Sequence, residues 1–500
     1  MTLPAFPLQS SPCHPNRGVV FGCRTAAVEL PGDLLTPFGV FCLLDQPSPS
    51  APGDGFLFEG ALGRFSYVGV GTERLTIRGG RASGAFGAAR LPEGPLQALR
   101  AALARQAAPR ADGLPPFCGG LAGYLGWGAC RFNERIPERL GPDPLFPEAD
   151  LLVVRELVAF DHRQGRSWAI ATGGDDAGRR AQRLADRVLR VLDGVPLRWP
   201  RALRAPAAHA LLRKRLPAAS PLGGGQRAFE RGVRRALEYI RAGDLFQVVL
   251  SQRFELPDCD GFSLYRSLRA ASPAPYHFYL RLGGRELFGA SPELLVQVDG
   301  GEVTVRPIAG TRPRGASLAE DQRLEAELRA DPKERAEHTM LVDLGRNDVG
   351  RVAEIGTVRV PRLMETERFS HVMHLTSEVT GKLRRGLDGV DAFAAAFPAG
   401  TLSGAPKIRA LEVIDELEPG ARGPYGGAVG WFSFAGDVQL AIAIRTLFRS
   451  EGRLFAQAGA GIVADSDPRR EWLEVMAKVR ASVGAAYGAA AAARAEGGLR

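Results

Sequence analysis

Lysine is scarce in this chain of 500 residues. Only five lysines contribute to the 64 basic residues, which exceed the 55 acidic residues and give a formal net charge of +9. Basic side chains interleaved with aromatic ones are typical of nucleic-acid binding. The densest basic stretch, residues 198–215, is instead rich in alanine and proline and poor in aromatic residues. We therefore expect no nucleic-acid partner.

Paired cysteines and long apolar runs are also lacking. The six cysteines, at positions 13, 23, 42, 118, 130 and 259, include no C-x-x-C pair, so neither a zinc ribbon nor a redox motif is expected. Reduced thiols of a cytosolic protein explain them best. No stretch approaches the roughly 18 apolar residues of a membrane span, and the start of the chain has no apolar signal-peptide core. The sequence predicts a cytoplasmic protein with no membrane partner.

Common catalytic motifs are absent as well. We find no P-loop, no serine nucleophile elbow and no H-E-x-x-H zinc motif. The stretch 459–464 fits the pattern G-x-G-x-x-A, but a turn sequence, residues 465–468, follows it where a dinucleotide site would begin a helix. A nicotinamide cofactor is therefore not expected.

Glycine and proline, with 61 and 36 residues, are abundant, and hydrophobic residues make up 45% of the chain. This composition predicts a folded protein with many strands and turns. Short β-prone runs fill residues 28–170, and apolar spacing predicts a helix over 179–192. Residues 196–226 carry five prolines and three successive glycines, which indicates a linker between a domain at 15–195 and a domain at 227–485.

The second half of the chain predicts both helices and strands. Helices are expected over 229–242, over 318–342 and from about residue 469 onward. Strands are expected at 245–254, 276–282, 293–298 and 303–307.

Two pairs of glutamates stand out in the predicted helices. Glu334 and Glu337 are three residues apart, and Glu471 and Glu474 repeat that spacing. Residues three apart share one face of a helix, so each pair can direct two carboxylates to one point. Carboxylate oxygens are the ligands that Mg²⁺ prefers. Two such helices facing each other would hold a cation and bind an acidic substrate through it, although most such pairs are merely solvated.

Glycine-bounded turns and one predicted strand supply further candidates. Glycine lets a backbone approach a ligand closely, so the turns around 310, 400–404, 423–427 and 459–461 can offer N–H groups to carboxylate oxygens. His374 lies in an alternating apolar run that would direct an imidazole toward a site, where it could serve as an acid or a base near neutral pH.

Taken in order, these segments resemble the chorismate-utilising enzymes. The resemblance covers about 230–480, and its most specific segments are 307–315, 331–348, 370–375, 400–407, 425–430, 442–446 and 457–466. Residues 35–37 and 64–69 are similar, more weakly, to the N-terminal domain of that family. Within the family, the chain resembles component I of the anthranilate synthase branch.

The resemblance implies both a fold and a reaction. The fold is α+β, with two large antiparallel β-sheets packed across each other, helices outside and the site between the sheets. In the reaction, ammonia adds at C2 of chorismate while the 4-hydroxyl leaves. Pyruvate elimination then aromatises the ring to anthranilate, the first step of tryptophan biosynthesis. The nitrogen source implied is a separate glutamine amidotransferase subunit, because this chain has no amidotransferase nucleophile turn.

The resemblance also implies roles for individual residues. Glu337 and Glu474 hold Mg²⁺, and Glu334 and Glu471 support the metal or its waters. His374 assists the elimination. The residues implied near the leaving hydroxyl are Glu293 and Thr401. The residues implied in substrate binding are Gly310, Thr311, Tyr425, Arg445, Gly459, Ala460, Gly461 and Lys478.

Gln247 separates the chain from its relatives that use water. Isochorismate and salicylate synthases carry a lysine base at this position, and glutamine is too weak a base to deprotonate water. The nucleophile implied is therefore ammonia. Two alternatives stay open. One is aminodeoxychorismate synthase of the folate pathway, and the other is an aminodeoxyisochorismate synthase that stops after the first step.

A regulatory tryptophan pocket, by contrast, is degenerate. The family has a serine where this chain has Gly60, after Glu59, and a methionine where it has His277, after Pro275 and Tyr276. The loop before Arg64 is also shortened. Loss of a hydroxyl and of a flexible thioether removes contacts with an indole ligand. We therefore expect tryptophan to inhibit this chain weakly or not at all.

Overall fold

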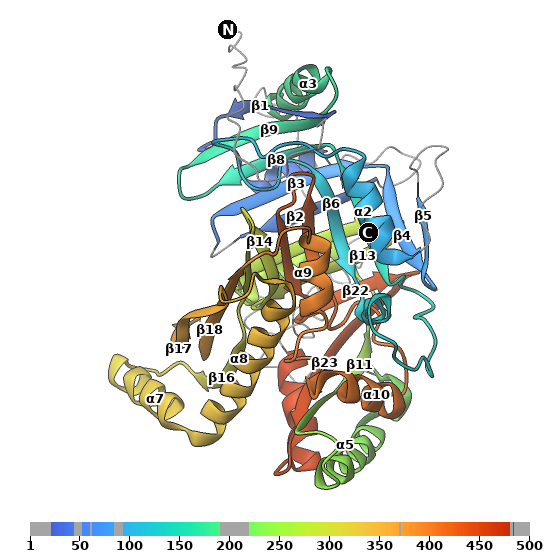
Figure 1. The fold of residues 1–500 in the computed structure, drawn as a ribbon, viewed down its shortest axis with the longest axis vertical. Helices are drawn as coiled ribbons and strands as arrows, with labels where there is room; N and C mark the ends of the chain where they lie inside the picture. Colours follow the sequence, from blue (N-terminus) through green and yellow to red (C-terminus); the bar gives the residue numbers. More distant parts are fainter. Residues whose placement is uncertain are drawn as a thin grey trace, which may run out of the picture.

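Two large antiparallel β-sheets form the framework of the structure, a computed structural model that describes residues 22–44, 53–60, 63–84, 94–190, 220–369, 372–480 and 484 (Figure 1). Within these residues the first sheet has 12 strands and the second has 11. The α+β fold with two antiparallel sheets is therefore confirmed.

The first sheet runs in the order β1 (Arg24–Leu30), β9 (Arg166–Gly173), β8 (Glu156–Asp161), β3 (Phe65–Gly71), β2 (Asp54–Glu59), β12 (Tyr276–Leu282), β13 (Arg285–Ser291), β22 (Thr446–Ser450), β23 (Arg453–Ile462), β11 (Gln247–Leu256) and β10 (Ser220–Pro221), with β19 (Gly404–Ala405) paired to β11. The second runs β16 (Ile308–Pro313), β18 (Val372–Lys382), β15 (Glu302–Val305), β14 (Leu294–Asp299), β21 (Val438–Ile442), β20 (Ala428–Ser433), β6 (Gly120–Leu125), β7 (Ala149–Val154), β4 (Arg74–Arg78) and β5 (Arg81–Gly84), with β17 (Arg359–Arg368) paired to β18.

Helices lie on the outside of the two sheets (Figure 1). They are α1 (Pro37–Leu44), α2 (Pro95–Ala104), α3 (Ala177–Leu189), α5 (Gly225–Arg241), α6 (Gly261–Ala271), α7 (Leu318–Ala330), α8 (Pro332–Val352), α9 (Gly389–Ala396), α10 (Lys407–Leu417) and a helix over 468–480. The short 3-10 helices η1 (Trp127–Phe132) and η2 (Leu222–Gly224) complete the described elements. Central strands such as β6 and β7 are buried at every position, because packed layers cover both of their faces.

Strands from the two halves of the chain alternate within both sheets. In the first sheet β2 pairs with β12, and in the second β6 pairs with β20. The segments 15–195 and 227–485 therefore share one framework, and their division into domains stays a prediction. Most of the predicted linker, up to residue 219, lies outside the described residues, while its last residues form β10, η2 and the start of α5.

The charged helix predicted over 318–342 is wrong as a single element. The chain forms α7 and α8, which meet at Asp331, and α8 continues to Val352. Asp331 leaves the helical conformation and caps α8, because its side chain accepts hydrogen bonds from the backbone N–H groups of Lys333 and Glu334 at 2.9 and 3.2 Å. Pro332 then occupies the first helical position, where its missing N–H costs nothing.

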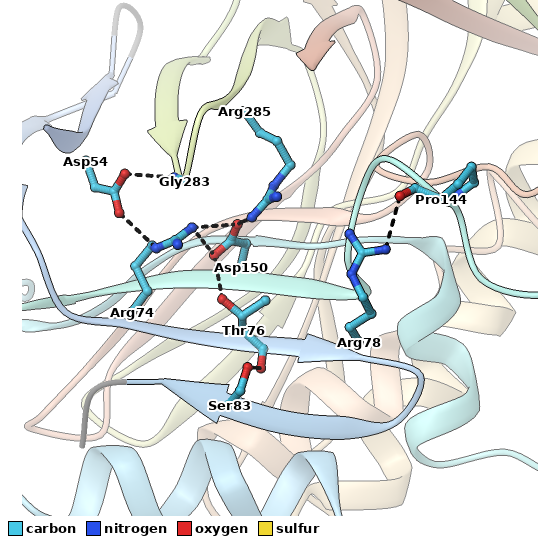
Figure 2. Close-up of polar contacts among 9 residues, drawn as sticks. All are labelled: Asp54, Arg74, Thr76, Arg78, Ser83, Pro144, Asp150, Gly283 and Arg285. Carbon is cyan, nitrogen blue, oxygen red and sulfur yellow. Dashed lines mark hydrogen bonds and ion pairs between the residues drawn. The ribbon is translucent and has the colours of Figure 1, made fainter. Parts of the chain in front are cut away.

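A charged cluster around the buried Asp150 joins the two sheets (Figure 2). Asp150 on β7 is fully buried and accepts hydrogen bonds from Arg285 at 2.6 Å, from Thr76 at 3.1 Å and from Arg74 at 3.3 Å. Arg74 in turn pairs with Asp54 at 2.8 Å. Since β2 and β13 belong to the first sheet and β4 and β7 to the second, the cluster fixes their relative position. Removing one partner would leave a buried charge uncompensated.

Candidate active site

A cavity of about 580 Å³ is lined by strands of both sheets, by α8 and by the helix over 468–480. It brings together nearly all of the site residues expected from the sequence. Its lining includes Gln247, Glu293, Gly310, Thr311, Glu334, Glu337, His374, Thr401, Tyr425, Arg445, Gly459, Gly461, Glu471, Glu474 and Lys478. Ala460 is outside this lining and is 1% exposed, because its side chain on β23 faces the opposite side from its two glycine neighbours.

Glu293 is a buried carboxyl group in the wall of this cavity, in the connection between β13 and β14. Burial raises its pKa to about 8, although the hydroxyl of Thr401 donates a hydrogen bond to Oε1 at 3.1 Å and lowers the pKa in part. The positive charges of Arg445 and Lys478 also lower the pKa of Glu293 in part. The group is therefore mostly a neutral acid at pH 7, able to give a proton to a leaving oxygen.

His374 on β18 lines the same cavity as Glu293 and is 7% exposed. Its Nδ1 lies 2.9 Å from the carbonyl oxygen of Gly310 and 3.0 Å from Oγ1 of Thr311. A carbonyl oxygen only accepts, so Nδ1 carries the proton and Nε2 is left as the basic nitrogen. Burial lowers the pKa of the imidazole, which keeps it neutral. The arrangement suits a proton acceptor.

Gln247 lies at the start of β11 and is 3% exposed. Its Oε1 is buried without a hydrogen-bond partner among the described residues. A side chain at position 461 would bring its Cβ within 2.9 Å of Nε2 of Gln247, so Gly461 leaves the space that the amide occupies. An unpaired buried acceptor is costly unless a ligand satisfies it. A small N–H donor at this point of the cavity would do so.

Four carboxylates form the acidic end of the cavity. Glu334 and Glu337 come from α8, and Glu471 and Glu474 come from the helix over 468–480. Burial, then the charges of Glu334 and Glu474, raise the pKa of Glu337. Burial, then the charge of Glu474, likewise raises the pKa of Glu471 against a hydrogen bond from Ser466. The two helices thus hold their acidic side chains close enough to repel one another.

Cations balance part of this acidic charge. Arg312 pairs with Glu334 at 2.9 Å and with Asp331 at 2.7 Å, and Lys478 pairs with Glu474 at 2.7 Å. In the described part of the chain, no group of three or more His, Cys, Asp or Glu side chains is arranged to hold a metal ion. The carboxylate oxygens nevertheless have the chemistry that Mg²⁺ prefers, and their mutual repulsion is what a divalent cation would relieve.

A cationic and hydroxyl-bearing wall of the same cavity adjoins the acidic end, because Lys478 belongs to both. Arg445 connects β21 and β22 with a φ of 50°, a strained conformation that tends to occur at functional sites. Burial lowers the pKa of its guanidinium, which still stays charged near pH 7. Tyr425 is 4% exposed, and Lys478 donates a hydrogen bond to the carbonyl of Gly459 at 3.0 Å. This wall suits a substrate carboxylate.

The five residues of the predicted regulatory pocket line a second cavity of about 210 Å³. They are Glu59, Gly60, Pro275, Tyr276 and His277. The second cavity also contains Trp431, and its lining shares no residue with that of the first. The loop predicted to be shortened includes residues 61–62, which lie outside the described residues.

Two of these side chains are already engaged by the protein. Glu59 accepts a hydrogen bond from Tyr265 at 2.5 Å and pairs with Arg269 at 3.0 Å. His277 is 2% exposed, and burial lowers its pKa to about 4, so it is neutral at pH 7. A Cβ at Gly60 would lie 2.5 Å from the carbonyl oxygen of Phe65, so a serine there requires the backbone to shift.

Sequence reasoning missed several residues around the active-site cavity. Arg312, which pairs with Glu334, and Lys333, which lines the cavity, belong to no pattern that marks them individually in the sequence. Glu418 and Arg422 form a buried ion pair behind its wall. Their spacing of four residues is the one available signal, but the same spacing is typical of exposed helix pairs.

Comparisons with known proteins agree on one family. Residues 55–484 match the model of the chorismate binding enzyme family. A Streptomyces coelicolor protein named anthranilate synthase component 1 is 48% identical over 487 residues, covering 93% of this chain and 89% of that protein. A Thermus thermophilus protein of the same name is 45% identical over 467 residues, covering 90% and 95%.

Solved structures give the same picture. The crystal structure of anthranilate synthase component I from Streptococcus pneumoniae matches with a TM-score of 0.72 and 34% identity, covering 91% of this chain and 98% of that one. The menaquinone-specific isochorismate synthase from Escherichia coli shares the fold, with a TM-score of 0.66 and 19% identity over 93% and 95%. Among the described residues, no helix is long and apolar enough to cross a membrane.

Proposed function

This chain belongs to the chorismate-binding enzyme family, and we propose that it converts chorismate and ammonia into anthranilate, pyruvate and water. Relatives with 40–48% identity over most of the chain carry the name anthranilate synthase component 1. They do not favour the aminodeoxychorismate or aminodeoxyisochorismate alternatives. The reaction is that of a carbon–oxygen lyase of tryptophan biosynthesis.

The observation that carries this proposal is the pairing of a neutral buried acid with a basic imidazole in one cavity. Glu293, with a pKa raised to about 8 by burial, can protonate the 4-hydroxyl as it leaves, and Thr401 holds the acid in place. Ammonia adds at C2, and water is released. Nε2 of His374 then accepts the proton from C2 while the bond between C3 and the enolpyruvyl oxygen breaks. The ring becomes aromatic, and the enol takes up a proton to give pyruvate.

The charges at the two ends of the cavity support the orientation of chorismate. Its enolpyruvyl carboxylate suits Arg445, Tyr425 and the backbone around Gly459, because a guanidinium matches two carboxylate oxygens. Its ring carboxylate then lies toward the acidic end. Gly310 and Thr311 contact the ring in this orientation.

A magnesium ion is the cation that this acidic end would need. Glu337 and Glu474 would hold it, and Glu334 and Glu471 would support its waters. Bound there, Mg²⁺ would supply the positive charge that the ring carboxylate requires. Arg312 keeps Glu334 aligned on α8, and Lys478 does the same for Glu474.

Ammonia as the nucleophile agrees with Gln247. An amide oxygen accepts a hydrogen bond from ammonia but does not deprotonate water. The name component 1 implies a second component in the relatives. We propose that a glutamine amidotransferase subunit supplies ammonia to this chain, in the cytoplasm.

An assay of nitrogen sources tests the proposal. The purified chain is mixed with chorismate and Mg²⁺, and anthranilate is followed by fluorescence while pyruvate is followed by reduction with lactate dehydrogenase. Ammonium is expected to support equal formation of both products. Glutamine is expected to support neither until an amidotransferase subunit is added. Turnover of glutamine by the homogeneous chain would refute the proposal that a separate subunit supplies the ammonia.

A further inference from the structure

Glu418 and Arg422 form a buried ion pair directly behind the wall of the active-site cavity. The residues follow α10 and are 5% and 2% exposed. Nη2 of Arg422 lies 2.7 Å from Oε1 of Glu418, and Nε lies 2.9 Å from Oε2. Neither side chain belongs to the cavity lining. Their effect on a substrate must therefore pass through other residues.

The remaining N–H groups of Arg422 bind two pieces of that wall. Nη1 donates to the carbonyl of Leu402 and Nη2 to the carbonyl of Val249, each at 2.7 Å. Leu402 follows Thr401 in the chain, and Val249 lies two residues after Gln247 on β11. The guanidinium also stacks on the ring of Trp127, with its central carbon 4.0 Å from the ring centroid. This side chain reinforces the link between the Thr401 loop and β11, which the pairing of β19 with β11 and the bond from the Val249 N–H to the carbonyl of Ser403 at 2.9 Å also make.

Glu418 fixes the same strand at a second point. Its Oε1 accepts hydrogen bonds from the backbone N–H of Ser251 at 2.7 Å and from the Ser251 hydroxyl at 2.8 Å. Gln457, which lines the cavity from β23, donates to that hydroxyl at 2.8 Å. Hydrogen bonds in such a buried network reinforce one another. The ion pair is therefore held rigidly, and through the bond from Arg422 to Leu402 it restrains the loop that carries Thr401.

We propose that Arg422 is a positioning residue that holds Thr401 in hydrogen-bonding contact with Glu293. This inference rests on the proposed function, because it assigns Arg422 a part in the same reaction. Arg422 does not contact Glu293 and is not itself part of the lining, but it touches three lining residues, Leu402, Val249 and the ring of Tyr425. Its loss would act by releasing the carbonyl of Leu402, so that the loop carrying Thr401 moves away from the acid.

Release of Thr401 has a signature that general loosening of the fold lacks. The hydrogen bond from Thr401 lowers the pKa of Glu293, so losing it raises that pKa. Arg445 and Lys478 are the cationic groups that act on Glu293, and the substitution leaves both in place. It also leaves His374 and the four glutamates of the cavity unchanged. The alkaline limb of the pH profile of kcat/KM is therefore expected to move upward.

The variant must remove both charges of the pair. Arg422→Met alone would leave Glu418 buried without its partner, whereas replacing both partners by neutral groups is often tolerated. We therefore compare Arg422→Met/Glu418→Gln with the wild type, with Arg422→Lys and with Thr401→Val. The matched control is Arg131→Met/Asp415→Asn, which removes an ion pair of 2.8 Å between η1 and α10, outside the cavity lining.

The kinetic results expected are specific to each variant. The double variant lowers kcat about 10- to 100-fold, as misplacement of a positioning group does, while the KM for chorismate changes less than about twofold. The alkaline limb of its pH profile of kcat/KM moves to higher pH, as it does in Thr401→Val. Adding Thr401→Val to the double variant causes no further loss of kcat. Arg422→Lys recovers part of the rate, and the control variant behaves like the wild type. Unchanged kcat, or losses that multiply when the substitutions are combined, would overturn the inference.

Hydrogen exchange separates this inference from the proposed function. In the protein without substrate, a peptide covering residues 399–406 is expected to exchange faster in the double variant than in the wild type or the control. Unchanged exchange there would also overturn the inference. If the wild type made no anthranilate, the proposed function would fail, and the exchange result would still show whether Arg422 holds the loop.

Discussion

Replacing Glu293 by glutamine removes the proton donor and preserves almost everything else at that position. At pH 7 a carboxyl group with a pKa of about 8 is about nine-tenths protonated, whereas an ordinary glutamate is protonated in roughly two molecules per thousand. Burial therefore raises the fraction of competent acid by roughly two orders of magnitude or more. Glutamine matches the neutral acid in shape, and its amide oxygen still accepts the hydrogen bond from Thr401.

We expect Glu293→Gln to lower kcat/KM for chorismate by about 10²- to 10⁴-fold, the usual contribution of a general acid. The pKa of Glu293 is raised, so its acid form persists through neutral pH and is lost as the pH rises through about 8. Wild-type kcat/KM should accordingly be flat below this pH and fall above it, and the variant should lack this limb.

The assay records anthranilate fluorescence from pH 6 to pH 10 at a constant concentration of free ammonia, so that the titration of ammonium does not distort the profile. Glu302→Gln, which changes an exposed glutamate on the neighbouring β15, serves as the control and should behave like the wild type. If Glu293→Gln kept the wild-type rate and the same alkaline limb, the assignment of Glu293 as the acid would be wrong.

The remaining predictions concern the metal, the elimination and regulation. Excess chelator should abolish turnover and Mg²⁺ should restore it. Glu337→Gln should lower activity by orders of magnitude with unchanged thermal unfolding, because it removes a charged ligand. Full activity in excess chelator would show that the reaction needs no metal ion. His374→Met should slow pyruvate release more than amination, so that the amino intermediate accumulates in a mass-resolved time course; equal slowing of both steps would assign His374 to binding. Tryptophan should inhibit at least tenfold more weakly than in a relative with the complete pocket, since Gly60 and His277 lack the serine hydroxyl and the methionine thioether. Half-inhibition at low micromolar tryptophan would show that the second cavity still binds it.

The sequence was sufficient to predict the fold class, and the candidate catalytic, metal and substrate-binding residues that it singled out, except Ala460, line one cavity because specific motifs carry them. The glutamate pairs are an example: their spacing placed each pair on one helix face, and both pairs do line one cavity. The break at Asp331 was harder to see, since the charged pattern runs through it. Asp-Pro, which caps and starts a helix, was the signal that outweighed the periodicity.

Long-range pairing could not be predicted from local patterns. That β2 pairs with β12, and β6 with β20, depends on packing between segments separated by more than a hundred residues. The buried pair of Glu418 and Arg422 was hidden for a related reason. Charged residues are mostly exposed, so only tertiary structure shows that Trp127 and two carbonyl groups enclose this guanidinium.

Mass analysis of the product formed from isotopically labelled ammonium tests the central claim most directly. The purified chain is incubated with chorismate, Mg²⁺ and the labelled ammonium. The aromatic product is then separated, and its mass is measured by mass spectrometry. The account predicts labelled anthranilate and an equal amount of pyruvate. A labelled amino acid that retains the enolpyruvyl group, an isomer aminated at C4, or a hydroxylated product without label would contradict it.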